Sequence, residues 1–196
     1  MTGRFIAFEG GDASGKSTQA RRVASDLGAV LTREPGGTAL GEMLRSLVLE
    51  PTTQVDLRAE ALMIAAARAQ HVAEVVRPAL DADRHVVTDR FTGSSLAYQG
   101  YASGLDIAAV RQLSAFATEG LWPDLTVLID VPVEVSMARL GGAPDRFERE
   151  AGEFHDKVRK GYLDLASTDD SWVVIDGTGS VEDVAAMVDA ALLSLS

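Results

Sequence analysis

Short apolar segments alternate along the chain with longer segments in which apolar residues recur at helical spacing. Five segments are almost wholly apolar and short enough to be strands: residues 5–8, 29–32, 85–88, 125–130 and 172–175. Helical patterns lie between them, over residues 16–27, 39–49, 59–80, 107–119, 134–140, 150–165 and 181–193. Because strands that are apolar on both faces are typical of a parallel sheet covered on both sides, this alternation predicts an α/β fold.

Nothing in the sequence divides the chain into parts. Its 196 residues contain no repeat, low-complexity tract or linker rich in proline and serine, so we expect one domain over residues 1–196. A content of 46% hydrophobic and 24% charged residues is ordinary for a globular enzyme. Charged residues follow each predicted strand, at the sheet edge where α/β proteins bind their ligands.

Charge and cysteine content exclude several classes of protein. The net charge of −11 argues against a surface that coats nucleic acid, although a mononucleotide needs only a local basic pocket. The absence of cysteine excludes disulfides, thiolate zinc sites and cysteine nucleophiles. Residues 1–4 show no signal-peptide pattern, and the longest apolar run, residues 61–67, is too short to cross a bilayer. We therefore expect a cytoplasmic enzyme without membrane or nucleic-acid partners.

The most specific motif follows the first predicted strand. Residues 5–18 read FIAFEGGDASGKST, which contains the phosphate-binding pattern G-x-x-x-x-G-K-[ST]. Glycines let backbone N–H groups surround a phosphate, and the following helix adds the positive end of its dipole. Lys16 supplies charge for the outer phosphates, and the Ser17 hydroxyl is placed for Mg²⁺. The motif predicts a nucleoside-triphosphate site formed by Gly10, Gly11, Asp12, Ala13, Ser14, Gly15, Lys16, Ser17 and Thr18.

An acidic and a basic residue, Asp89 and Arg90, close the third predicted strand. An aspartate in this place can hold Mg²⁺ together with Ser17, as the second acidic element of such enzymes does. Arg90 offers a planar fork for a phosphate. An ion pair between neighbouring loops is the alternative, but the nearby phosphate loop favours the metal and phosphate roles.

Several blocks of the sequence together resemble the bacterial thymidylate kinases, which move the γ-phosphate of ATP to dTMP in dTTP biosynthesis. The blocks are FEGGDASGKST, TREPGGT with GEMLRSLVLE, RAQHVAEVVRPAL, DRFTGSSLAYQG and GLWPDLTVLIDV, in the family's order. The resemblance implies a P-loop NTPase-type fold, with a five-stranded parallel sheet, helices on both faces and a short lid at about residues 141–150. It also implies a homodimer that requires Mg²⁺ and ATP.

The resemblance assigns residues to the phosphate and sugar of dTMP. Arg45 and Arg90 match the arginines that grip the phosphate, although Arg45, in a helical segment, could instead pair with Glu42. Asp12 matches the carboxylate that meets the sugar 3′-hydroxyl and helps order the metal. Tyr98 matches the ring beneath the deoxyribose, where a ribose 2′-hydroxyl would be crowded.

The matched base site departs from the family at one position. Arg68, Ser95 and Gln99 match residues that read the thymine edge, and an arginine after six largely apolar residues favours a pocket role. Where the family usually has an aromatic ring stacked on thymine, this chain has Ile64. Because isoleucine forgoes stacking worth about 0.5–1.5 kcal/mol, we expect weaker dTMP binding than with phenylalanine there.

The matched ATP site depends on charge from the lid. Arg139 and Arg146 lie in the segment that matches the lid over the ATP phosphates, and the turn at Asp176 and Gly177 matches the loop against adenine. Ala13 stands where some family members carry a catalytic arginine. That charge must then come from the lid, and we favour Arg146 as its source.

The predicted reaction needs countercharge and no general base. A phosphate acceptor is already anionic near neutral pH, because the second pKa of a phosphate monoester is about 6. Bringing two polyanions into line requires positive charge. We therefore take the catalytic residues to be Lys16, Arg90, Asp12 and Arg146. The three histidines are interpreted as structural or solvent-facing.

Two other functions stay open at this point. A kinase for another nucleoside monophosphate, such as dUMP or a purine nucleotide, is kept open by Ile64. A P-loop ATPase or switch usually needs switch segments, whereas residues 33–38 and 90–99 look like a second anion pocket. A non-catalytic nucleotide sensor is disfavoured, since Lys16, Ser17 and Asp89 are all present.

Overall fold

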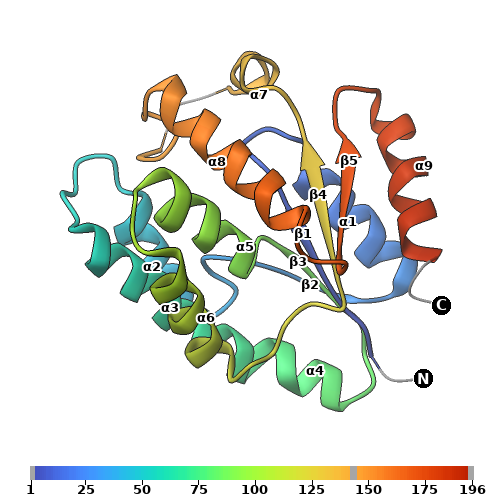
Figure 1. Cartoon of the computed structure of the whole chain (residues 1–196). Helices are drawn as coiled ribbons and strands as arrows, with labels where there is room; N and C mark the ends of the chain where they lie inside the picture. Colours follow the sequence, from blue (N-terminus) through green and yellow to red (C-terminus); the bar gives the residue numbers. More distant parts are fainter. Residues whose placement is uncertain (1–2, 142–144, 194–196) are drawn as a thin grey trace.

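The computed structural model of the chain describes residues 3–141 and 145–193, and its core is one parallel sheet with the strand order β2-β3-β1-β4-β5 (Figure 1). The strands are β1 (Phe5–Glu9), β2 (Val30–Arg33), β3 (Val86–Asp89), β4 (Leu125–Asp130) and β5 (Trp172–Asp176). All five predicted strands are confirmed. Four of them end one residue later than the apolar pattern predicts, because ladder pairs such as Phe8 with Asp89 continue to the charged ends.

Helices connect consecutive strands. They are α1 (Lys16–Leu27), α2 (Ala39–Leu49), α3 (Leu57–His71), α4 (Arg77–Asp81), α5 (Thr92–Ser95), α6 (Ile107–Thr118), α7 (Val133–Arg139), α8 (Gly152–Ala166) and α9 (Val181–Leu192). Two π-helical segments, η1 (Val72–Val76) and η2 (Leu96–Ala102), continue α3 and α5. The helix predicted over residues 59–80 is thus one helical run from α3 through α4 that widens at η1.

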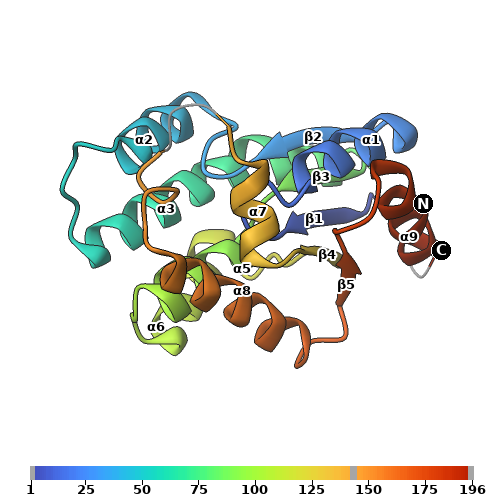
Figure 2. The same cartoon turned by 90° about the horizontal axis from the view of Figure 1, so that it is seen from above.

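The two faces of the sheet bury separate clusters of apolar side chains. Ile6 and Phe8 of β1 point to one face, where they pack with Val23 of α1 and Val184 of α9. Phe5 and Ala7 point to the other face, against the helical run from α3 through α4. This alternation is what a strand covered on both sides requires. Figure 2 shows α1 and α9 on one side of the sheet, and α3 and α6 on the other.

The segment from α5 through η2 is helical although the sequence analysis assigned no element to it. Its residues Thr92–Ser95 include a glycine and lack a helical apolar period, so local propensity does not favour a helix there. Its helix is instead stabilised by burial against α8. The approach is close: a Cβ at Gly161 of α8 would lie 2.7 Å from the Tyr101 ring.

The lid predicted at about residues 141–150 lies partly outside the described residues, since 142–144 are among those not described. Its second half, residues 145–150, forms a turn that meets the end of α2, where the Arg146 amide donates to the Leu49 carbonyl over 3.3 Å. In residues 3–141 and 145–193, no helix combines the length and apolar character that a bilayer crossing needs.

Candidate active site

The phosphate loop joins β1 to α1 and depends on backbone conformations that favour glycine. Gly10 and Gly15 have φ angles of 145° and 95°, and a Cβ at Gly10 would lie 2.5 Å from the Ile129 carbonyl oxygen. Ala13 also has a positive φ, 52°, within the loop. The loop therefore carries the tight turn that the motif predicts, directly before the N-terminus of α1.

Lys16 lies back over this loop. Its Nζ donates to the Gly11 carbonyl oxygen over 2.9 Å, and only 5% of the residue is exposed. Burial, together with the nearby charge of Arg90, lowers the pKa of Lys16 to about 8, although Asp12, Asp89 and Glu9 act in the opposite sense. A buried ammonium in this position is a charge for which a bound phosphate would be a better partner than a carbonyl.

Ser17 and Asp89 meet beside the loop, as the sequence predicts for a metal pair. The Ser17 hydroxyl donates to Oδ2 of Asp89. The other oxygen, Oδ1, is buried and has no hydrogen-bond partner among the described residues. A hydroxyl and a carboxylate with one unused oxygen are the hard oxygen donors that Mg²⁺ prefers, so the residues present fit this ion.

Arg90 connects the end of β3 to the phosphate loop. Its backbone has φ 71°, a conformation that is strained for a residue other than glycine. Its guanidinium donates hydrogen bonds of 2.6–3.3 Å to five groups: the Gly10 carbonyl, Ser94 Oγ, the Tyr162 hydroxyl, Asp12 Oδ1 and the Tyr98 hydroxyl. The strained backbone is thus held by a dense set of side-chain contacts.

Asp12 takes its character from this arginine. Burial alone raises the pKa of Asp12, but the charges of Arg90 and Lys16 more than offset it, so the pKa lies below its usual value. The second carboxylate oxygen accepts a hydrogen bond of 3.1 Å from the Tyr98 hydroxyl. Asp12 is therefore an ionised acceptor at the boundary between the phosphate loop and the segment after β3.

A fully buried carboxylate, Glu9, supports the segment after β3 from below. It accepts hydrogen bonds from the backbone N–H groups of Phe91 and Ser94, at 2.9 and 3.0 Å, and from the hydroxyls of Ser94 and Tyr162. Burial raises the pKa of this carboxyl. Glu9 fixes the neighbours of Arg90 and so helps to aim its side chain.

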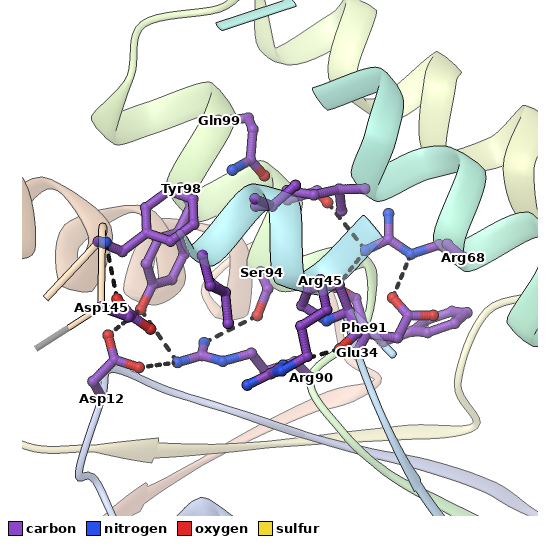
Figure 3. A pocket seen from close by; sticks show the side chains of 16 residues that line it. Asp12, Glu34, Arg45, Arg68, Arg90, Phe91, Ser94, Tyr98, Gln99 and Asp145 are labelled. Carbon is purple, nitrogen blue, oxygen red and sulfur yellow. Dashed lines mark hydrogen bonds and ion pairs between the residues drawn. The ribbon is translucent and has the colours of Figure 1, made fainter. Parts of the chain in front are cut away.

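Beyond Arg90 lies a cavity with about 600 Å³ of empty space, within the range of small-ligand pockets (Figure 3). All eight residues predicted to bind the acceptor line it: Asp12, Arg45, Ile64, Arg68, Arg90, Ser95, Tyr98 and Gln99. They come from the phosphate loop, α2, α3 and the helical segment after β3. Arg45 is held there by the Pro35 carbonyl, to which its Nη1 donates over 2.9 Å.

Arg68 forms the most deeply buried charge of this cavity. Its Nε donates to Glu34 over 2.7 Å, and Nη2 donates to the Phe91 carbonyl and to Ser95 Oγ, both over 3.0 Å. The second oxygen of Glu34 pairs with Nδ1 of His71, which accounts for that histidine as a structural residue. A charge that is 1% exposed requires this degree of pairing.

A second hollow lies on the other side of the phosphate loop, lined by Ala13, Ser14, Gly15, Thr18, Gln19, Arg139, Gly177, Gly179, Ser180, Val181 and Val184. Arg139 Nη1 donates to the Gly177 carbonyl over 3.0 Å, so two residues predicted to bind ATP meet here. Asp176 is exposed and accepts from the backbone and hydroxyl of Thr178, which shapes the turn. Asp176 does not line the hollow.

Arg146 is the predicted site residue that the structure does not bring to the phosphate loop. Its Nε donates to the Val48 carbonyl over 2.8 Å, its Nη2 pairs with Glu60, and its guanidinium lies 4.4 Å from the centre of the Phe147 ring. The physical reason is Glu60, a carboxylate that is 1% exposed and needs a cation. In this structure Arg146 therefore stands on the acceptor side.

Sequence reasoning did not single out Glu34, Glu60 or Phe147. Glu34 and Phe147 line the acceptor cavity, and Glu60 lies directly behind it, bound to Gln99. For Glu60 a signal was available, because it precedes Ile64 and Arg68 by four and eight residues and therefore shares their helix face. Phe147 gave no such signal, since its place in the cavity depends on how the turn after residue 144 folds.

Fold and site together define a P-loop phosphotransferase with separate hollows for a donor and an acceptor. The family profile described as thymidylate kinase matches residues 8–188. The thymidylate kinase of Carboxydothermus hydrogenoformans is 47% identical over 191 residues, covering 94% of each chain, and that of Leifsonia xyli subsp. xyli is 50% identical over 194 residues, covering 95% of this chain and 92% of the relative. The chain belongs to the thymidylate kinase family.

A solved structure agrees with this assignment. The thymidylate kinase from Ehrlichia chaffeensis superimposes with a TM-score of 0.81 at 32% sequence identity, covering 98% of this chain and 99% of the other. The predicted P-loop NTPase-type fold, with its five-stranded parallel sheet, is confirmed. The ATPase or switch alternative is not favoured.

Proposed function

We propose that this chain transfers the γ-phosphate of ATP to dTMP, giving dTDP and ADP. The observation that carries the proposal is the shared wall of the two hollows. Asp12 and Arg90 line the acceptor cavity and are at the same time bonded to each other and to the phosphate loop. An acceptor phosphate beside Arg90 would therefore lie next to the outer phosphate of a bound ATP.

On the donor side, the backbone N–H groups of the loop and α1 would surround the ATP phosphates, with Lys16 adding charge. We propose that adenine occupies the hollow between the loop and the turn at Gly177, beneath Arg139. The side chain of Gln19 braces this hollow, since it donates to the Val181 carbonyl over 3.0 Å.

We propose Ser17 and Asp89 as the protein ligands of Mg²⁺. The buried Oδ1 of Asp89, which lacks a partner among the described residues, is the observation that supports this. Mg²⁺ usually keeps few protein ligands and completes its shell with waters and substrate phosphates. When bound, the ion would neutralise charge that develops on the transferred group.

On the acceptor side, Arg45 and Arg90 would hold the dTMP phosphate, which is already a nucleophile near neutral pH. No general base is needed. Burial raises the pKa of Tyr98, so its hydroxyl stays protonated and keeps donating to Asp12 beside the sugar. Arg68, Ser95 and Gln99 would face the base, with Ile64 against the ring.

The fourth proposed catalytic residue is Arg146. For that role its guanidinium must exchange Glu60 and the Val48 carbonyl for the phosphates, at the point when both substrates are bound. The proposal is supported by Ala13, which leaves the phosphate loop without an arginine of its own at that position.

We further propose that the protein works in the cytoplasm as a homodimer. Helices α2, α3 and α6 lie together on the side of the sheet away from α1 and α9 (Figures 1 and 2). They carry large apolar side chains that are exposed: Leu40, Met43, Leu47, Leu62 and Phe116. Phe116 is 83% exposed, more than an isolated chain would favour. A second copy of the chain is the proposed cover.

An ADP-release assay with ATP, Mg²⁺ and a panel of monophosphates tests the function. We expect dTMP to give the highest kcat/KM, followed by dUMP, with purine nucleotides far behind. ADP release that does not depend on any monophosphate would instead indicate an ATPase. A purine nucleotide as the best acceptor would replace dTMP in the proposal and leave the donor site intact.

A further inference from the structure

Behind the acceptor cavity, three side chains from separate segments form one buried hydrogen-bonded chain. Gln99 of η2 donates from Nε2 to Oε1 of Glu60 on α3 over 2.7 Å, and Arg146 pairs with Oε2 of the same carboxylate. Gln99 and Glu60 are 2% and 1% exposed. The carboxylate has no access to water, so these two contacts determine how it is used.

The charge of Glu60 determines which way the amide of Gln99 points. An ionised carboxylate only accepts hydrogen bonds, so the amide must turn its NH₂ group toward Glu60. The ion pair with Arg146 favours that ionised form. The carbonyl oxygen, Oε1, is then left for the cavity that Gln99 lines, and no residue of the described chain bonds to it (Figure 3).

The orientation of this amide has a consequence for the base. Thymine carries a hydrogen on N3, which a carbonyl oxygen can accept, whereas N3 of cytosine is itself an acceptor. An acceptor fixed toward the base therefore favours the first and rejects the second. Sites built for one hydrogen-bonding pattern discriminate strongly against the other, because the mismatched polar groups are left buried and unpaired.

We propose that Glu60 is a positioning residue for base selection: it fixes the Gln99 amide so that the pocket accepts bases with a hydrogen on N3. This inference rests on the proposed function, in which Gln99 faces the base of dTMP. Glu60 does not line the cavity and acts only through Gln99. With a glutamine at position 60, which both donates and accepts, the amide of Gln99 is free to turn round.

The matched pair of acceptors for the test is dTMP and 5-methyl-dCMP, which share the methyl group, sugar and phosphate and differ at positions 3 and 4 of the ring. In Glu60→Gln we expect the ratio of their kcat/KM values to fall about tenfold or more, the size of one hydrogen bond lost and one gained. A merely structural role would lower both values in parallel. Glu74→Gln, which alters an exposed glutamate beyond α3, should leave the ratio unchanged.

Two further variants keep the test decisive if Glu60→Gln folds poorly with Arg146 left unpaired. The double variant Glu60→Gln/Arg146→Gln removes both charges and should show the same fall in the ratio, whereas Arg146→Gln alone should keep the ratio within about threefold. In a Gln99→Leu background, Glu60→Gln should have no further effect on the ratio. A fall there, or an unchanged ratio in the Glu60 variants, would overturn the proposal.

Neutron diffraction from the unchanged protein with dTMP tests the same point without any variant. The deuterons on the Gln99 amide should lie on the side of Glu60, and deuterons aimed at the base would overturn the proposal. Failure of the unchanged protein to phosphorylate dTMP would sink the proposed function instead, so the two failures can be told apart.

Discussion

The donor loop and the acceptor cavity recognise phosphate in opposite ways. The donor site is built from consecutive residues, Gly10–Thr18, and relies on backbone N–H groups, one lysine and glycine conformations. The acceptor site is built from side chains that lie up to 135 residues apart, between Asp12 and Phe147, and its positive charges are arginines. A backbone cradle can be encoded in a short motif, whereas a side-chain pocket exists only after the chain has folded.

The two sites nevertheless share one wall. Arg90 is bonded to the Gly10 carbonyl and to Asp12, and it also lines the acceptor cavity. Whatever disturbs this residue should affect both substrates. Changes elsewhere should affect only one of them, and the following predictions use this difference.

The largest effect is expected from Arg90→Ala. It removes a charge from both sites and leaves Asp12 without its ion pair, so kcat/KM for ATP and for dTMP should both fall about 10³-fold or more. Steady-state kinetics with each substrate varied in turn checks this. Arg58→Ala, which alters an exposed arginine at the start of α3, is the control. An effect confined to one substrate would show that the wall is not shared.

Next in size is Arg146→Ala. If the lid supplies the missing charge for the transferred phosphate, kcat should fall about 10²-fold or more, with a much smaller rise in the KM for dTMP. The structure makes this a sharp test, because Arg146 stands on the acceptor side. A raised KM for dTMP with kcat unchanged would assign Arg146 to the acceptor cavity alone.

The pH dependence should differ between the two sites. Because the pKa of Lys16 is lowered to about 8, its charge is lost as the pH rises through that value, and kcat/KM for ATP should fall about tenfold between pH 8 and pH 9.5. The acceptor site holds its phosphate with arginines, which keep their charge over this range. The KM for dTMP at saturating ATP should therefore stay nearly constant, and a parallel rise would contradict the assignment.

The smallest effect is expected from Ile64→Phe, which places a ring against the base. The KM for dTMP should fall about threefold, within the range of one stacking contact, while the KM for ATP stays the same. Thermal unfolding would serve as the check on packing, since Ile64 is 8% exposed. An unchanged or raised KM would mean that the base is already stacked from another side, for which the Phe147 ring is the candidate.

The same contrast explains what the sequence could predict. The strands, most helices and the phosphate loop depend on local patterns, and they were found with errors of one or two residues at most strand ends. The helix from α5 through η2 was missed because its stability comes from burial against α8 and not from its own residues. Its residues were nevertheless assigned to the site through a family resemblance.

Side-chain partners were beyond the reach of sequence patterns. The ion pairs of Arg68 with Glu34 and of Arg146 with Glu60 join residues that are 34 and 86 positions apart. No propensity or period encodes such a choice, because a lone glutamate on a helix more often faces water. Only the packing of α3 against its neighbours shows that Glu60 has no water to face.

The left-handed backbone at Arg90 means that the fold and the reaction make different demands on one position. Glycine would relax that conformation and would lack the guanidinium on which both substrates depend. Engineering that selects only for a higher melting temperature would then be drawn toward an inactive protein at this position. Improved variants of this enzyme should be chosen by turnover first and by heat resistance second.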